Sequence, residues 1–124
     1  MKLQERKALL KKELQKYIDK SFFCPCLNAY VLVTKESIKE TVYWASLEDE
    51  STKLALKLPE IIKNAVIYKS NLKPKPGKQT KKFYFSEIFI LLSKISIGTA
   101  KLTIGYKKSG KYIEYCITNF NKNK

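Results

Sequence analysis

Residues 99–119 read TAKLTIGYKKSGKYIEYCITN, and their pattern is the clearest indication of the fold. Apolar and polar residues alternate on both sides of Ser109-Gly110, which is typical of two half-buried strands joined by a tight turn. A two-residue turn at this dipeptide fixes the predicted register: Lys108 faces Lys111, Lys107 faces Tyr112, Gly105 faces Glu114, Thr103 faces Cys116 and Lys101 faces Thr118. A slip of one residue would mix the two faces, so burial specifies this register strongly.

The predicted hairpin has one apolar and one polar face. The apolar face carries Ala100, Leu102, Ile104 and Tyr106 against Ile113, Tyr115 and Ile117. The polar face carries Lys101, Thr103, Lys107, Tyr112, Glu114 and Thr118, and Gly105 leaves space above the backbone opposite Glu114. The sequence therefore predicts a rigid sheet surface with one carboxylate among lysines and hydroxyl groups.

Such a surface suits phosphodiester chemistry. Glu114 is the candidate general base, Lys101 or Lys107 would stabilise a pentacovalent phosphate, Thr118 completes the catalytic candidates, and Tyr112 would stack on a base. The alternative is the solvated face of an antiparallel sheet with ordinary Lys–Glu pairs. The catalytic hypothesis and the expectation of an anionic partner both require that the C-terminal lysines converge over the last strands and that the face bearing Glu114 is not packed under a helix.

Charge is distributed very unevenly along the 124 residues, whose net charge is +14. Residues 1–62 hold 11 Lys and Arg against 9 Asp and Glu, whereas residues 63–124 hold 14 Lys against only Glu87 and Glu114. A one-sided field of this kind attracts anionic partners. The predicted nucleic-acid contacts are hydroxyl groups of the last hairpin and lysines of the loop over residues 70–81 and just after it: Thr103, Tyr112, Lys73, Lys75, Lys78, Lys81 and Lys82.

The remaining pattern predicts one α+β domain over residues 1–124. An apolar stripe predicts a helix over residues 2–20, which either docks on the body or serves oligomerisation or a membrane surface. A loop over 21–28, a strand over 29–34 and helices to residue 64 follow, with Thr34 or the pair Ser37 and Glu40 as the first cap. Strands over 65–69, 82–94, 99–107 and 111–119 complete a roughly four-stranded antiparallel sheet with helices on one face.

Several kinds of site are excluded by composition. Without histidine there is no His-based acid–base or triad chemistry, and the sequence has no phosphate loop or dinucleotide fingerprint. Cys24, Cys26 and Cys116 are too few for a structural zinc site, so we expect reduced cysteines and neither metal nor cofactor. The N-terminal segment is charged throughout and no apolar run approaches the roughly 18 residues of a membrane span, so we expect a cytoplasmic protein.

Two segments resemble a known group of domains: KESIKETVYWAS at residues 35–46 and LALKLPEIIKNAVIY at residues 54–68, with the closing IEYCIT at residues 113–118. Together they resemble the large polyvalent protein-associated domains of phages and conjugative elements, and the phage nucleases of the barnase/colicin/RelE-like superfamily, over roughly residues 29–119. The resemblance implies helices on a four-stranded antiparallel sheet and an RNase-like role. It also implies Lys39 or Glu40, with Lys101, Lys107 and Thr118, as site residues, although such nucleases often use a histidine.

The sequence thus favours a basic domain of mobile genetic elements that acts on nucleic acid, with RNA favoured, either as a binding module or as a metal-free endoribonuclease. The alternative is a protein-interaction module or inhibitor of a host protein, which would contact an acidic partner through Tyr43, Trp44 and the N-terminal helix. A third alternative is an accessory domain without a ligand of its own.

Overall fold

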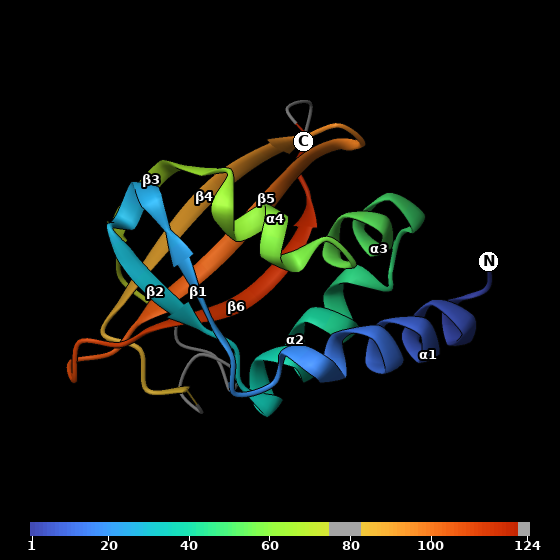
Figure 1. Cartoon of the computed structure of the whole chain (residues 1–124), viewed down its shortest axis with the longest axis horizontal. Helices are drawn as coiled ribbons and strands as arrows, with labels where there is room; N and C mark the ends of the chain where they lie inside the picture. The colour runs from blue at the N-terminus through green and yellow to red at the C-terminus, as the bar shows by residue number, and fades with distance from the viewer. Residues whose placement is uncertain (75–82, 122–124) are drawn as a thin grey trace.

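The computed structural model describes residues 1–74 and 83–121, which form an α+β fold (Figure 1). The helices are α1 (Leu3–Leu14), α2 (Lys35–Ala45), α3 (Asp49–Ala55) and α4 (Leu58–Lys63), with short 3-10 turns η1 (Gln15–Tyr17) and η2 (Pro25–Leu27). The strands are β1 (Ser21–Cys24), β2 (Ala29–Leu32), β3 (Ala65–Leu72), β4 (Glu87–Ile95), β5 (Gly98–Tyr106) and β6 (Tyr112–Asn119).

The six strands form one curled, mixed sheet in the order β1-β2-β6-β5-β4-β3. The predicted antiparallel meander is present as β3 to β6, but the prediction of about four strands was wrong, because the hairpin β1–β2 extends the sheet through a parallel pairing of β2 with β6. Residues 21–28 were predicted as a loop on account of Pro25. In the structure Ser21–Cys24 form β1, Pro25 begins η2 and Asn28 follows in the left-handed region (φ 49°), so only residues 25–28 form the hairpin turn.

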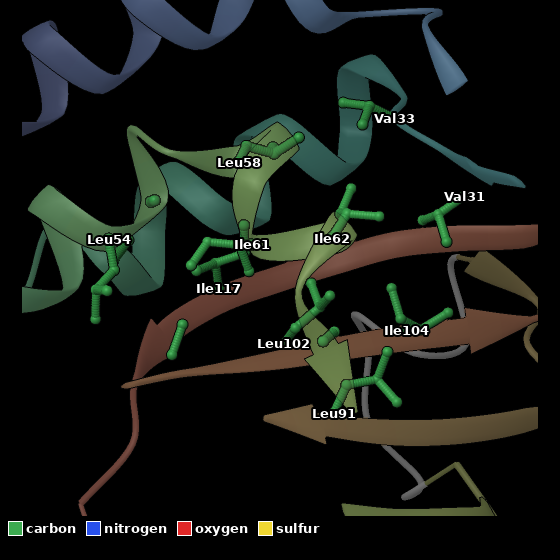
Figure 2. Packing of buried hydrophobic residues seen from close by; sticks show 14 of the residues in the cluster. Val31, Val33, Leu54, Leu58, Ile61, Ile62, Leu91, Leu102, Ile104 and Ile117 are labelled. Carbon is green, nitrogen blue, oxygen red and sulfur yellow. The ribbon is translucent and has the colours of Figure 1, made fainter. Parts of the chain in front are cut away.

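All four helices lie on one side of the sheet and form the core with it (Figure 1). Leu58, Ile61 and Ile62 of α4 pack over Leu91, Leu102, Ile104 and Ile117 of the central strands, as Figure 2 shows. These seven side chains are completely buried. At roughly 1.5–3 kcal/mol for each buried aliphatic side chain, this contact fixes which sheet face receives the helices.

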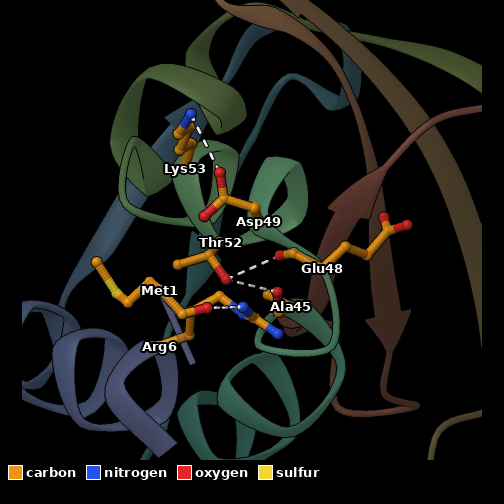
Figure 3. A network of polar contacts seen from close by, with 7 residues as sticks. All are labelled: Met1, Arg6, Ala45, Glu48, Asp49, Thr52 and Lys53. Carbon is orange, nitrogen blue, oxygen red and sulfur yellow. Dashed lines mark hydrogen bonds and ion pairs between the residues drawn. The ribbon is translucent and has the colours of Figure 1, made fainter. Parts of the chain in front are cut away.

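The N-terminal helix α1 packs on the rest of the domain, which is the first of the two roles that the sequence left open for it. Leu10 and Leu14 are fully buried, and α1 packs against α2 and α3. Arg6, the single arginine of the chain, donates from Nε to the carbonyl oxygen of Ser46 at 2.6 Å and from a terminal nitrogen to the carbonyl of Met1 (Figure 3). This side chain therefore satisfies a carbonyl just beyond the end of α2.

Hydrogen bonds also define the beginning of α2 and its junction with α3. Thr34 is the N-cap, since its hydroxyl accepts from the Ser37 N–H at 3.0 Å and the Ser37 hydroxyl lies 2.8 Å from the Thr34 nitrogen. At the junction, the Thr52 hydroxyl lies 2.8 Å from the Ala45 carbonyl and 2.9 Å from the Glu48 carbonyl (Figure 3). The two helices are thereby held as one unit.

The register of the last hairpin differs from the prediction in its outer half. Tyr106 pairs with Tyr112 and Ile104 with Glu114, one residue away from the predicted pairs, whereas Thr103–Cys116 and Lys101–Thr118 were predicted correctly. The offset begins in the turn, which has three residues: the Lys107 N–H donates to Lys111 and the Gly110 N–H to Lys107. A two-residue turn would place a positive φ at Ser109, whereas here the positive φ (94°) falls on Gly110.

A β-bulge in β6 removes the offset again. Tyr115 is the extra residue between the pairs Ile104–Glu114 and Thr103–Cys116. Because side chains alternate between the faces of a strand, the bulge changes the face on which the residues before it lie. Ile113 and Tyr115, predicted on the helix-covered face, instead pack on the opposite face with Phe83, Phe85 and Ile88, while Glu114 lies on the helix-covered face.

Candidate functional site

A groove of about 710 Å³ lies on the sheet face opposite the helices. Its floor and walls come from β3, β4, β5, β6 and the residues that follow β6: Leu72, Ile88, Ile90, Thr103, Tyr115, Thr118 and Phe120 are among them. The alternation of β5 explains the position, since Lys101 and Thr103 point away from the helices while Ala100, Leu102 and Ile104 are buried beneath them. We call this feature the groove.

The groove is positively charged. Lys69, Lys73 and Lys101 line it, and none of its lining residues within the described part of the chain is acidic. All three lysines are exposed, and the described residues contain a single ion pair, between Lys53 and Asp49 on α3. The groove lysines are therefore not neutralised by carboxylates of the described chain, and their positive potential is available to an anion.

Aromatic rings lie at two places along the groove. Tyr68, half exposed, packs edge-on against Phe120 with 5.6 Å between ring centroids, and Lys69 Nζ lies 5.6 Å from the centroid of Tyr68. Tyr115 contacts Phe83 and Phe85 at centroid distances of 5.2 and 5.8 Å. Burial raises the pKa of Tyr115, and so does its hydrogen bond to the Glu40 carboxylate of α2. The groove thus combines cations, hydroxyl groups and aromatic faces.

Four predicted site residues are brought together in the groove: Lys73, Lys101, Thr103 and Thr118. Lys101 and Thr118 are directly paired across β5 and β6, as the sequence predicted. The predicted contacts Lys75, Lys78, Lys81 and Lys82 lie outside the described residues.

The structure places Glu114 where it cannot serve as the predicted general base. Its side chain is 0% exposed on the face covered by α2, and the Thr41 hydroxyl donates to its Oε2 at 2.6 Å. Burial raises the pKa of this carboxyl to about 8, although hydrogen bonds from Thr41 and Ser37 act in the opposite direction. Within the described part of the chain its Oε1 has no hydrogen-bond partner. Glu114 is therefore a buried core carboxyl, and the surface that the sequence predicted around it, for catalysis and for an anionic partner alike, is wrong on this point.

Lys107 and Tyr112 are not at the groove either. Lys107 begins the β5–β6 turn together with Lys108 and Lys111, beyond the lining residues. Tyr112 packs on the helix-covered face, 4.8 Å from Tyr106 and 5.7 Å from Phe89 between ring centroids, and burial raises its pKa. The register offset accounts for the face of Tyr112, whereas Lys107 lies too far along the hairpin, so the C-terminal lysines converge only in part.

Among the groove residues that the sequence did not predict are one lysine and three aromatic residues: Lys69, Tyr68, Tyr115 and Phe120. The predicted strand over 65–69 contained Tyr68 and Lys69, but nothing in its pattern showed which face they occupy, because β3 is an edge strand whose residues after Ala65 are all exposed. Tyr115 was assigned to the apolar face by the register that the bulge overturns. A bulge leaves no clear signal in a strand that alternates so regularly.

Residues that could hold a metal do not gather in the structure. Within residues 1–74 and 83–121 no three Cys, Asp or Glu side chains are grouped as ligands, and Cys24, Cys26 and Cys116 are free thiols. Cys24 Sγ and Cys26 Sγ lie 3.6 Å apart. Burial, and next to it the charge repulsion of the Cys24 thiolate, raise the pKa of the Cys26 thiol to about 12.

None of the helices in the described ranges has the length and apolar character that crossing a bilayer demands.

The sequence matches one protein family, large polyvalent protein-associated domain 3, over residues 1–115. No curated protein and no solved structure matches the chain. The match begins at residue 1 and so includes α1 and the β1–β2 hairpin, which the resemblance over residues 29–119 left partly outside. It confirms the resemblance to the large polyvalent protein-associated domains, while the nuclease resemblance stays a prediction. The match covers nearly the whole chain, and the protein therefore belongs to the large polyvalent protein-associated domain 3 family.

Proposed function

We propose that the chain binds single-stranded nucleic acid in the groove, with RNA as the favoured ligand. The observation that carries the proposal is the position of Lys69, Lys73 and Lys101 beside aromatic side chains, with no acidic residue lining the groove in the described chain. Proteins that bind single strands combine a basic groove, which follows the phosphates, with aromatic rings on which bases stack. Family membership fits the predicted association with mobile genetic elements.

The groove lining favours a strand with accessible bases over a fully paired duplex. Leu72, Ile88 and Ile90 give it an apolar surface, and Tyr68, Tyr115 and Phe120 offer rings at its walls. In a duplex the base faces are stacked on each other and cannot reach such rings, whereas an unpaired strand can turn its bases toward them. Thr103, Thr118 and Asn119 add hydrogen-bonding groups that suit ribose hydroxyls and base edges.

Binding is better supported than cleavage. A metal-free ribonuclease needs a general base within hydrogen-bonding reach of the substrate, and none of the groove residues in the described chain is a carboxylate. Glu114 is enclosed under α2, and Glu40 is engaged by the Trp44 indole N–H at 3.2 Å and by Tyr115. We therefore propose a binding domain.

The test compares two sets of lysine substitutions that remove the same charge. Lys69, Lys73 and Lys101 are changed together to Ala, and Lys107, Lys108 and Lys111 of the β5–β6 turn are changed together as the control. Affinity for a fluorescein-labelled 12-nucleotide RNA is measured by anisotropy over a salt series. We expect the groove substitutions to lower affinity at least about tenfold and to reduce the slope of log K against log[salt] by about 2, since each contact with a single strand contributes about 0.7.

The control set at the turn should change both affinity and slope far less. Equal losses in the two sets would show that only overall charge matters, and absence of RNA binding by the wild type would refute the proposal outright. Heparin bound as tightly as RNA, at equal salt, would also contradict it, because heparin has no bases to stack.

The protein-interaction alternative has an observation of its own. Tyr43, Trp44 and Leu47 are 52%, 40% and 50% exposed at and just after the C-terminal end of α2, and Lys7 of α1 lies 5.9 Å from the Tyr43 ring centroid. An apolar surface bordered by a basic helix would suit an acidic protein partner. Substitution of Leu47 by Ala should weaken such an interaction and leave binding of RNA in the groove unchanged.

A further inference from the structure

Three consecutive aromatic residues, Phe83, Tyr84 and Phe85, precede β4, and they differ in exposure: the outer two are buried and the middle one is exposed. Phe83 and Phe85 are 6% and 7% exposed, stack on each other at 5.2 Å between centroids and belong to the aromatic cluster with Ile88 and Ile113. Tyr84, between them, is 83% exposed, the highest exposure of any large hydrophobic residue described. The two phenylalanines therefore anchor a short segment from which the tyrosine projects.

The backbone of Tyr84 is in an unfavourable conformation. Its φ is +56°, in the left-handed region that bulky residues rarely adopt. A residue with a Cβ costs roughly 1–2 kcal/mol there, whereas Gly, Asn or Asp would be tolerated. A ring exposed to this extent gains almost nothing from burial, so the packing of Phe83 and Phe85, and not that of Tyr84 itself, holds this backbone conformation. Strained residues of this kind cluster at ligand-binding sites.

The packing of Phe83 and Phe85 places the backbone of Tyr84 at one end of the groove. Phe83 and Phe85 contact the Tyr115 ring, and Tyr115 lines the groove. Ile88 belongs both to the cluster that holds the two phenylalanines and to the groove lining. The Tyr84 backbone therefore lies between two residues that contact Tyr115 at the end of the groove, while its ring projects into solvent and is not part of the groove lining.

We infer that Tyr84 is a stacking contact for a base of the strand that occupies the groove. This inference rests on the proposed function and extends it, because it takes the ligand past the Tyr115 wall onto an aromatic residue outside the groove. A tyrosine held by two buried neighbours loses little conformational freedom on binding, and its exposed ring offers a face to any base. The contact therefore adds affinity without selecting a sequence.

The first test separates stacking from charge. Binding of a labelled 12-nucleotide oligoadenylate and of inorganic polyphosphate is measured for the wild type and Tyr84→Ala, with Tyr43→Ala as an exposed tyrosine remote from the groove. We expect Tyr84→Ala to lower oligoadenylate affinity about tenfold, with an unchanged salt slope and unchanged polyphosphate binding. Tyr84→Trp should keep or raise the affinity, and Tyr43→Ala should match the wild type.

The second test separates a binding role from a structural one. Tyr84→Asn relieves the left-handed backbone, so we expect a midpoint of urea unfolding no lower than that of the wild type, together with the same loss of oligoadenylate affinity. Equal affinity of Tyr84→Ala and wild type would overturn the inference and leave the groove proposal standing. A lower midpoint for Tyr84→Asn would show that the ring serves folding. Failure of the wild type to bind oligoadenylate would remove both proposals.

Discussion

Substitution of Glu114 by Gln is expected to stabilise the protein by about 4 kcal/mol at pH 8 and to have little effect at pH 4.5. Burial raises the pKa of this carboxyl from 4.5 to about 8 in the folded state. Between these values the folded protein keeps a proton that the unfolded chain releases, so the free energy of unfolding falls as the pH rises, by about 1.4 kcal/mol per unit. Gln stays neutral at every pH and keeps an oxygen that accepts from the Thr41 hydroxyl, so the free energy of unfolding of the variant does not fall in this way as the pH rises.

The measurement is urea unfolding of wild type and Glu114→Gln at several pH values between 4.5 and 8.5. Glu60→Gln serves as the control, because Glu60 is exposed on α4 and its replacement removes a charge without disturbing a buried contact. The expected result is a wild-type stability that declines with pH and a Glu114→Gln curve that is flatter. Parallel curves for the two proteins would mean that Glu114 does not bind a proton in the folded protein at these pH values.

Substitution of Gly105 by Ala is expected to cost about 3 kcal/mol of stability. A Cβ on Gly105 would lie 2.3 Å from the Phe85 ring, well inside van der Waals contact. The ring would have to leave its place on β5, and with it the packing against Phe83 and Tyr115 would be lost. Loss of a buried phenylalanine from a core typically costs about 3–5 kcal/mol, and part of this would be recovered by relaxation. Chemical denaturation gives the value directly.

Two further variants make the cause of that loss visible. In a Phe85→Ala background the added methyl group enters space that the ring has left, so Gly105→Ala should then cost much less, and the double-mutant cycle should show strong coupling. Gly110→Ala is the matched glycine control: its φ is 94° and nothing lies within 4 Å of its Cβ position, so only the backbone cost of about 1 kcal/mol is expected. Additive losses at Gly105 and Phe85 would contradict the contact.

Much of the architecture was predictable because local patterns were strong. The alternation in residues 99–106, the Thr34 cap and the apolar stripe with Leu10 and Leu14 each gave the element that the structure contains. The strand predicted over residues 29–34 is present as β2, but β1 and its pairing with β2 were not predicted, because two strands of four residues gain their place from distant partners, β6 for β2 and α4 for β1. Short strands of this kind depend on distant partners rather than on their own propensity.

The site could be predicted only in part, and β6 shows why. The pairing of Lys101 with Thr118 was correct, because the apolar residues Ala100, Leu102 and Ile117 hold that half of the hairpin in register under the helices. The other half followed from the assumed turn at Ser109-Gly110, and a difference of one residue there moved Glu114 to the opposite face. Glu114, the predicted general base, was thus the residue whose sheet face was predicted least securely.

Side-chain periodicity and composition, which are local or additive, were enough to predict the α+β class, the antiparallel meander and the excess of lysine over acid in the second half of the chain. Tertiary structure alone decided that Glu114 is enclosed beneath α2, that Tyr115 turns to the open face, and that Lys69, Lys73 and Lys101 meet at one groove. Those outcomes depend on one bulge and on the twist that brings β3 beside the end of β6, and both are properties of the packed sheet rather than of any single strand.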